Sequence, residues 1–183
     1  LGLAKVGGDK GIGPILDALR ADDGNDAYKH DGLVRAMEKI GPPAMLRVSA
    51  LLESKNESDR ALAVDLFSRF RSRAAGDVLS SVVGKEGLQA ADREALIRSY
   101  RNYQFDPPLN IEPMVKYVES HPDCGVGVQL AALEMIGLFA ASKPAGASDF
   151  VGALADNLNP AVRMAAIRAS GSLASPAIAA ALG

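Results

Sequence analysis

The sequence has one cysteine, no tryptophan and few aromatic residues of any kind. The single cysteine, Cys124, excludes an internal disulfide and a cysteine-rich zinc site. Aromatic residues make up 5% of the chain although 48% of its residues are hydrophobic, so its apolar residues are mainly alanine, leucine, valine and isoleucine. Sheet-rich domains normally carry more β-branched and aromatic residues, whereas small and unbranched side chains pack closely between helices. This composition predicts an all-α fold.

An excess of charge of one sign is also missing. The 20 lysines and arginines are balanced by 22 aspartates and glutamates. Proteins that bind phosphate backbones usually carry a basic surplus, so nucleic acid is not the expected partner. No apolar run approaches the roughly 20 residues that a membrane-spanning helix needs. We therefore expect no membrane segment in this chain, and its composition leaves the compartment open.

A helical pattern recurs along the chain. In the clearest copy, residues 159–173, apolar side chains return every three or four positions. The residue at the centre of this pattern is Ala166, and we call it and its counterparts in the other copies the anchor positions. The anchors are Gly2, Ala36, Ala63, Leu96, Ala132 and Ala166, at successive spacings of 34, 27, 33, 36 and 34 residues.

A second set of helical segments lies between the first. These segments are 13–19, 43–52, 77–83, 112–118, 149–154 and a last one at 176–182, with glycine and proline breaks between the pairs. A repeated helical hairpin cannot bury its apolar face alone, and stacking it on the next copy forms a solenoid. We predict about five hairpins in a single repeat domain over residues 1–183. Both ends read as pieces of apolar helix, so we expect a fragment of a longer protein with neighbouring domains.

The segment Asn159–Ile167 and the Ala-x-x-x-Ile/Leu-Gly helix endings resemble HEAT and HEAT-like repeats, of the short bacterial kind named for phycobilisome lyase subunits. The resemblance covers essentially the whole chain. It implies an armadillo-like α–α superhelix and a non-catalytic scaffold that binds a protein or peptide through its concave face. Residues 26–36 are also similar to HEAT segments of large secreted proteins of planctomycete-type bacteria. Those proteins often carry a c-type haem domain, but this chain has no Cys-x-x-Cys-His motif to hold a haem.

Arginine and tyrosine residues break the alanine-rich pattern in the middle of the chain. In HEAT repeats the second helix of each pair commonly lines the concave face, so these residues form a candidate binding surface. An arginine and tyrosine surface can hold an acidic peptide, a phosphate or single-stranded nucleic acid through charge and stacking. The simpler interpretation is a solvated face on which arginine stems cover apolar surface. The candidate residues are Arg60, Arg69, Arg93, Arg98, Tyr100, Arg101 and Tyr103.

No residue set predicts a catalytic, cofactor or metal site. His121, Asp123 and Cys124 lie within four residues, but a structural zinc site needs four ligands, and we interpret the segment as a turn in which Asp123 caps the next helix. We interpret the acidic cluster 22–26 in the same way, as a turn with a helix cap. The alternative function is an enzyme or enzyme accessory of the chromophore-lyase or DNA-glycosylase type. That function would require a carboxylate, or the Cys124 thiol, in an aromatic pocket.

Overall fold

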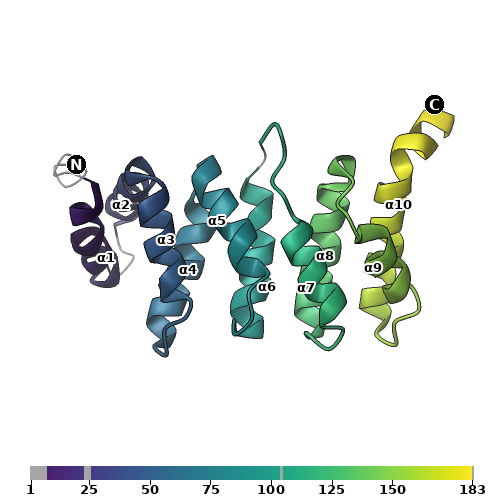
Figure 1. Ribbon diagram of the computed structural model, residues 1–183, viewed down its shortest axis with the longest axis horizontal. Coiled ribbons are helices and arrows are strands. Elements are labelled where there is room, and N and C mark those ends of the chain that lie inside the picture. The colour runs from purple at the N-terminus through teal and green to yellow at the C-terminus, as the bar shows by residue number, and fades with distance from the viewer. Residues whose placement is uncertain (1–7, 23–25, 104, 183) are drawn as a thin grey trace. The chain divides into compact units, whose positions relative to one another are not determined.

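The computed structural model describes residues 8–22, 26–103 and 105–182 (Figure 1). These residues form ten α-helices and three short 3₁₀ helices, with no strand among them, so the predicted all-α fold is confirmed. The anchor at Gly2, together with Asp23 and Asn25 of the acidic cluster, lies outside the described residues.

The chain divides into two compact units, Leu1–Val82 and Val83–Gly183. In the first unit, α1 packs on α2, α2 on α3, and α3 on α4. The helices of this unit are α1 (Ile12–Arg20), α2 (Ala27–Ile40), α3 (Pro42–Leu51), α4 (Glu57–Arg69) and α5 (Arg73–Val83), whose last residue belongs to the second unit, and a short helix η2 (Gly8–Gly11) precedes them.

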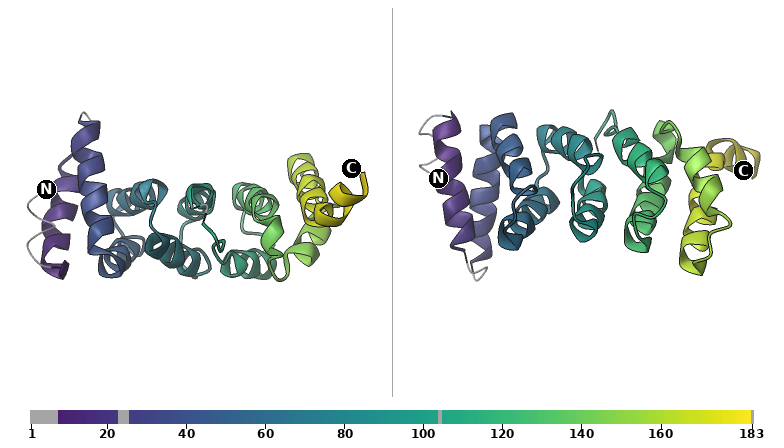
Figure 2. Two further views of the ribbon diagram at one scale, coloured as in Figure 1. Left: turned by 90° about the horizontal axis from the view of Figure 1, so that it is seen from above. Right: turned by 60° about the horizontal axis from the view of Figure 1, so that its bottom comes forward.

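In the second unit, α8 lies between α6 and α10, while α7 packs against α8 and α9 (Figures 1 and 2). Helices α6, α8 and α10 therefore form one layer, and α7 and α9 form the other. The elements of this unit are α6 (Ala90–Ser99), η3 (Tyr100–Asn102), α7 (Glu112–Ser120), α8 (Val126–Leu138), η4 (Ala140–Ser142), α9 (Ala147–Leu154) and α10 (Pro160–Leu182).

The ten helices overlap the ten segments predicted along residues 13–173. The expected break before the segment 176–182 is wrong, because α10 continues through it to Leu182. A proline inside a helix removes one backbone hydrogen bond without always ending the helix, and the alanines around Pro176 favour helix.

Four of the five described anchors lie in the cores of their units, whereas Ala36 is half-buried. Ala63, Leu96, Ala132 and Ala166 are fully buried. Asparagines cap the N-termini of helices α4 and α10. The side chains of Asn56 and Asn159 accept hydrogen bonds from backbone N–H groups of the first turn. Among the described residues, no helix is both long and apolar enough to cross a membrane.

Candidate binding surface

The seven residues of the predicted surface are divided between the two units and between core and exterior. Arg60 and Arg69 lie on α4 of the first unit, and the other five lie in the second unit. Arg93, Tyr100 and Tyr103 are buried. The prediction that these three side chains form part of an exposed surface is therefore wrong.

Both tyrosines contribute aromatic packing to the second unit. The Tyr100 ring meets Phe139 edge-on, with ring centroids 6.2 Å apart. Tyr103 lies against Phe105 at the same centroid separation of 6.2 Å. Burial of an aromatic ring removes a large apolar area from water. This gain in free energy favours packing of both rings in the core. Neither ring offers an exposed face on which a nucleic acid base can stack.

Arg93 is held inside the second unit by its backbone and aromatic neighbours. Its guanidinium donates hydrogen bonds to the carbonyl of Val83 and to that of Lys85, the latter at 2.6 Å from Nη2. The guanidinium carbon lies 3.4 Å from the centre of the Tyr117 ring, which makes a cation–π contact. Burial lowers the pKa of Arg93 from its ordinary value, since the charged form loses hydration. Arg93 thus ties the loop before α6 to α7.

In four hairpins, the residue three positions before the anchor donates hydrogen bonds to backbone carbonyls that precede its helix. We call it the clamp position, and it is occupied by Arg60, Arg93, Gln129 and Arg163. Arg60 donates to the carbonyl of Ser54 at 3.1 Å. Gln129 donates to Pro122, and Arg163 to Asn157. Each clamp side chain therefore satisfies carbonyls of the loop between the two helices of its own hairpin, which explains why a long donor recurs there.

Arg69 belongs to an ion-pair cluster of the first unit. Its guanidinium lies 2.8 Å from Asp65 and 3.6 Å from Asp31. The hydrogen bond to Asp65 raises the pKa of Arg69. His30 joins the same cluster, with Nε2 at 3.1 Å from Asp65 and Nδ1 at 2.9 Å from the buried carboxylate of Asp22.

Arg98 and Arg101 are the two residues of the predicted surface that lie at the exterior of the second unit. Both pair with Glu134 of α8, at 2.9 Å from Arg98 and 2.7 Å from Arg101. Arg98 also pairs with Glu94 at 3.0 Å. Two carboxylates thus balance two guanidinium groups, which leaves little positive charge at this point for a phosphate backbone.

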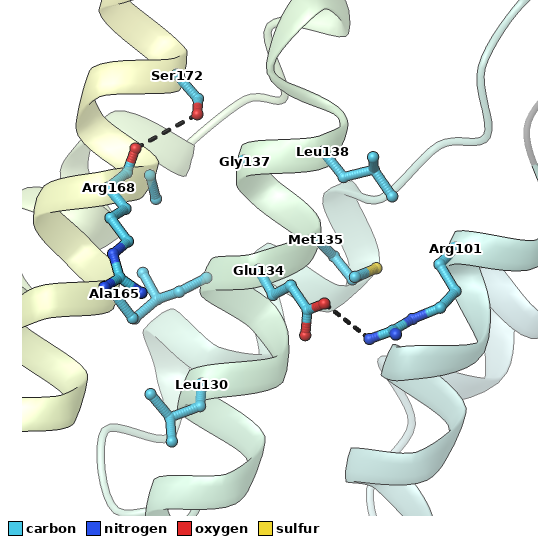
Figure 3. Close-up of a pocket in the computed structure, with 11 residues that line it drawn as sticks. Arg101, Leu130, Glu134, Met135, Gly137, Leu138, Ala165, Arg168 and Ser172 are labelled. Carbon is cyan, nitrogen blue, oxygen red and sulfur yellow. Dashed lines mark hydrogen bonds and ion pairs between the residues drawn. The ribbon is translucent and has the colours of Figure 1, made fainter.

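A groove opens beside this cluster, along α8 and α10 (Figure 3). It has a volume of about 510 Å³. Leucines from α8 and alanines from α10 form its apolar part, and Arg101 and Arg168 stand on its two sides. The lining residues on which the argument below depends are Leu130, Leu133, Leu138, Ala165, Ala169 and Arg168.

Among the residues that line the groove, only Arg101 belongs to the predicted surface. A comparison of repeats 34 residues apart is the signal that could have identified Arg168, since it places Arg168 at the position of Glu134.

The segment around Cys124 is the predicted turn, closed by a hydrogen bond from the Cys124 N–H to the carbonyl of His121. The His121 ring stacks on Tyr117, with centroids 4.3 Å apart, and its Nε2 lies 3.3 Å from Glu86. The expectation that Asp123 caps the next helix is wrong. Helix α8 begins after Gly125, whose φ of 97° suits glycine, and it has no side-chain cap.

The surroundings of Cys124 favour the protonated thiol. Burial raises its pKa, and the nearby Arg93 charge compensates for only part of this effect. Within the acidic cluster, Asp26 caps α2, as the sequence predicts. Its side chain accepts a hydrogen bond from the Lys29 N–H at 3.0 Å. In the described part of the chain, no group of three histidine, cysteine or acidic side chains is placed to hold a metal ion.

Comparison with models of known protein families found no match to this chain. A search of curated proteins found no match either.

Proposed function

We propose that this chain is a HEAT-like solenoid, formed by a single repeat domain over residues 1–183, and that it acts as a non-catalytic scaffold for a protein or peptide partner. Three features support the repeat architecture. Four of the five described anchors are buried, the clamp position has the same role in four hairpins, and the helices of the second unit form two layers. In such an array each hairpin buries its apolar face on the next.

The open groove of the second unit carries the functional proposal. Exposed apolar surface has a free-energy cost unless a partner covers it, and contiguous patches of this kind mark interaction sites. Leu138 keeps 48% of its surface exposed at the edge of the groove. Leu130 and Ala165 line the same groove. A partner that inserts an apolar side chain here would remove this surface from water.

The charges around the groove indicate the chemistry of the partner. Arg101 is compensated by Glu134, whereas the guanidinium of Arg168 makes no ion pair among the described residues. A carboxylate on the partner would find Arg168 available. We therefore propose a peptide segment in which apolar side chains are flanked by acidic ones. Complementary charge of this kind chiefly sets specificity and the association rate.

The test uses a fluorescein-labelled synthetic peptide in which leucines alternate with pairs of glutamates. We expect saturable binding in fluorescence anisotropy, and Leu138→Asp should weaken it at least about tenfold, which corresponds to about 1.4 kcal/mol. The matched control is Leu46→Asp, at an exposed leucine of α3 in the first unit. This substitution should leave the affinity unchanged.

A second peptide, with lysines in place of the glutamates, tests the charge argument. It should bind at least about tenfold more weakly than the acidic peptide. Equal binding of the two peptides, or binding unaffected by Leu138→Asp, would show that the groove is not the site.

Single-stranded DNA and catalysis are less well supported than peptide binding. Tyr100 and Tyr103 are buried, and the charges of Arg98 and Arg101 are balanced by carboxylates. A site for single-stranded DNA needs uncompensated positive charge and exposed aromatic rings on which bases can stack. These residues supply neither. The raised pKa of Cys124 likewise disfavours a thiolate nucleophile at neutral pH.

A further inference from the structure

Three helices of the second unit present the same face in the same register. When α6, α8 and α10 are aligned on their anchors, one face consists of the residues at positions −2, +1, +4 and +5 from each anchor. We call it the following face. It comprises Glu94 and Ile97 on α6 with Tyr100 and Arg101 on η3, then Leu130, Leu133, Ile136 and Gly137 on α8, and finally Met164, Ile167, Ser170 and Gly171 on α10.

Helix α8 covers the following face of α6. Tyr100 packs against Phe139, just beyond the end of α8. The carboxylate of Glu94 comes so close to Gly127 that a Cβ at that glycine would collide with it. Ile97 is fully buried as a result.

Helix α10 packs against α8 and covers part of its following face. A Cβ on Gly137 would lie 3.6 Å from the Ser172 hydroxyl, which places the two helices in close contact at this point. Leu133 keeps 1% of its surface exposed. Small side chains of the covering helix, Ala165 and Ala169, line the same space as Leu130 and Leu133.

The following face of α10 is open in the part of the chain that the structure describes. Met164 is 50% exposed and Ile167 is 55% exposed, whereas Leu133, the counterpart of Ile167 on α8, is 1% exposed. Ser170 and Gly171 are exposed as well. The position of Ile167 is thus apolar on all three helices, buried on α6 and α8, and exposed on α10.

Charge at a neighbouring position indicates what kind of helix fits. Position +2 from the anchor holds Arg98 on α6, Glu134 on α8 and Arg168 on α10. The first two form an ion pair between neighbouring helices at 2.9 Å. Arg168 continues this alternation of sign, and its guanidinium has no ion pair among the described residues. A helix added in register would therefore place its own position +2 next to Arg168.

We propose that the following face of α10 binds an amphipathic α-helix of a partner that carries a carboxylate at this position. The helix has small or apolar side chains at positions −1, +3 and +6, as Ala131, Met135 and Leu138 do on α8. Its acidic residue pairs with Arg168, as Glu134 pairs with Arg98. This surface is separate from the groove, although Arg168 borders both, and the proposal does not depend on the groove being occupied.

The test uses two helix-stapled, fluorescein-labelled peptides with the sequence of residues 159–173. One peptide carries Arg168→Glu and the other keeps the arginine, so they differ in a single charge. We expect the acidic peptide to bind at least about tenfold more tightly in fluorescence anisotropy. Ile167→Asp in the protein should abolish this binding, and circular dichroism should confirm that the variant remains folded.

A charge reversal supplies a readout that a merely structural role would not change. Arg168→Glu in the protein should reverse the preference between the two peptides. Leu138→Asp should leave both affinities unchanged, which separates this proposal from peptide binding in the groove. Equal affinity for the two peptides, or binding that survives Ile167→Asp, would overturn the proposal. A concentration-dependent dimer in sedimentation, abolished by Ile167→Asp, would also overturn it, because a second copy would then cover the face.

Discussion

Replacement of Arg93 by alanine tests the role of the clamp position at its most buried example. The substitution removes two hydrogen bonds to loop carbonyls and the contact with the Tyr117 ring. It also leaves a space where a long side chain, only 1% exposed, had been packed. We therefore expect Arg93→Ala to destabilise the second unit severely.

The magnitude follows from these contacts. A hydrogen bond that involves a charged group contributes about 1.5–3 kcal/mol. A partly desolvated cation–π contact adds roughly 1–2 kcal/mol. The lowered pKa of Arg93 shows that burial of its charge carries a cost, which offsets part of this gain. We expect a net loss of about 3 kcal/mol, since two carbonyls lose their hydrogen-bond donor while the cost of burying the charge is removed.

Tyrosine fluorescence during urea unfolding can measure this effect. The chain has 4 tyrosines and no tryptophan. Tyr100, Tyr103 and Tyr117 belong to the second unit, whereas Tyr28 of the first unit is almost fully exposed. The signal therefore reports mainly the second unit. In thermal unfolding, a loss of about 3 kcal/mol should lower the Tm by roughly 12 °C or more in a unit of about 100 residues.

Two substitutions serve as matched controls. Arg163→Ala removes the clamp of the last hairpin, where the guanidinium binds the carbonyls of Asn157 and Leu158 without an aromatic stack. It should cost about 1 kcal/mol, because the side chain is only half-buried. Arg47→Ala, at an exposed arginine, should change stability by less than about 0.5 kcal/mol. Arg93→Lys should recover little, since an ammonium cannot reach both carbonyls and stack on a ring at once.

The reasoning would be refuted if Arg93→Ala cost no more than Arg163→Ala. That result would show that burial and the aromatic contact add nothing to the clamp.

Three further predictions concern other positions. The pH midpoint for alkylation of Cys124 by iodoacetamide should lie above that of the urea-unfolded chain, because burial raises the pKa of the thiol and keeps it protonated to higher pH. Gly84→Ala should cost about 1–3 kcal/mol in urea unfolding, because its Cβ would lie 2.9 Å from the Pro113 carbonyl oxygen. The matched substitution Gly152→Ala, in open space on α9, should instead stabilise by up to about 1 kcal/mol. His30→Ala should lower the free energy of unfolding by about 1–3 kcal/mol, measured by circular dichroism, because it leaves the buried carboxylate of Asp22 without its nearest partner.

Each of these predictions has a contradicting outcome. A midpoint for Cys124 at or below that of the unfolded chain would show an activated thiol. Equal effects of the two glycine substitutions would mean that the close approach at Gly84 is relieved at no cost. An unchanged stability after His30→Ala would mean that solvent replaces the histidine at Asp22.

Local signals in the sequence were sufficient for the helices. The recurrence of Ala63, Ala132 and Ala166 in an apolar pattern, with glycine and proline between the copies, located ten helices because periodicity and chain breaks act within a few residues. The same locality explains the two errors. The glycine conformation that starts α8 at Gly125 and the continuation of α10 through Pro176 depend on backbone details that residue type does not reveal.

The candidate site was predictable only in part, because burial is a property of neighbours that are distant in the sequence. Arg60 and Arg93 occupy the same repeat position and cannot be distinguished by pattern. Arg60 remains half-exposed, whereas Arg93 is enclosed with Tyr117, which lies 24 residues further along the chain. Tyr100 reads as an exposed aromatic beside two arginines, yet its ring packs on Phe139.

The sequence by itself determined the helical content, the repeat spacing and the long donor at each clamp, because these follow from short-range periodicity and hydrogen-bonding capacity. Only the tertiary structure decided which arginines face solvent, which carboxylate pairs with Arg98, and that Met164 and Ile167 stay open on α10. Those outcomes depend on which helix lies next to which, and packing between helices is decided by contacts that no local segment contains.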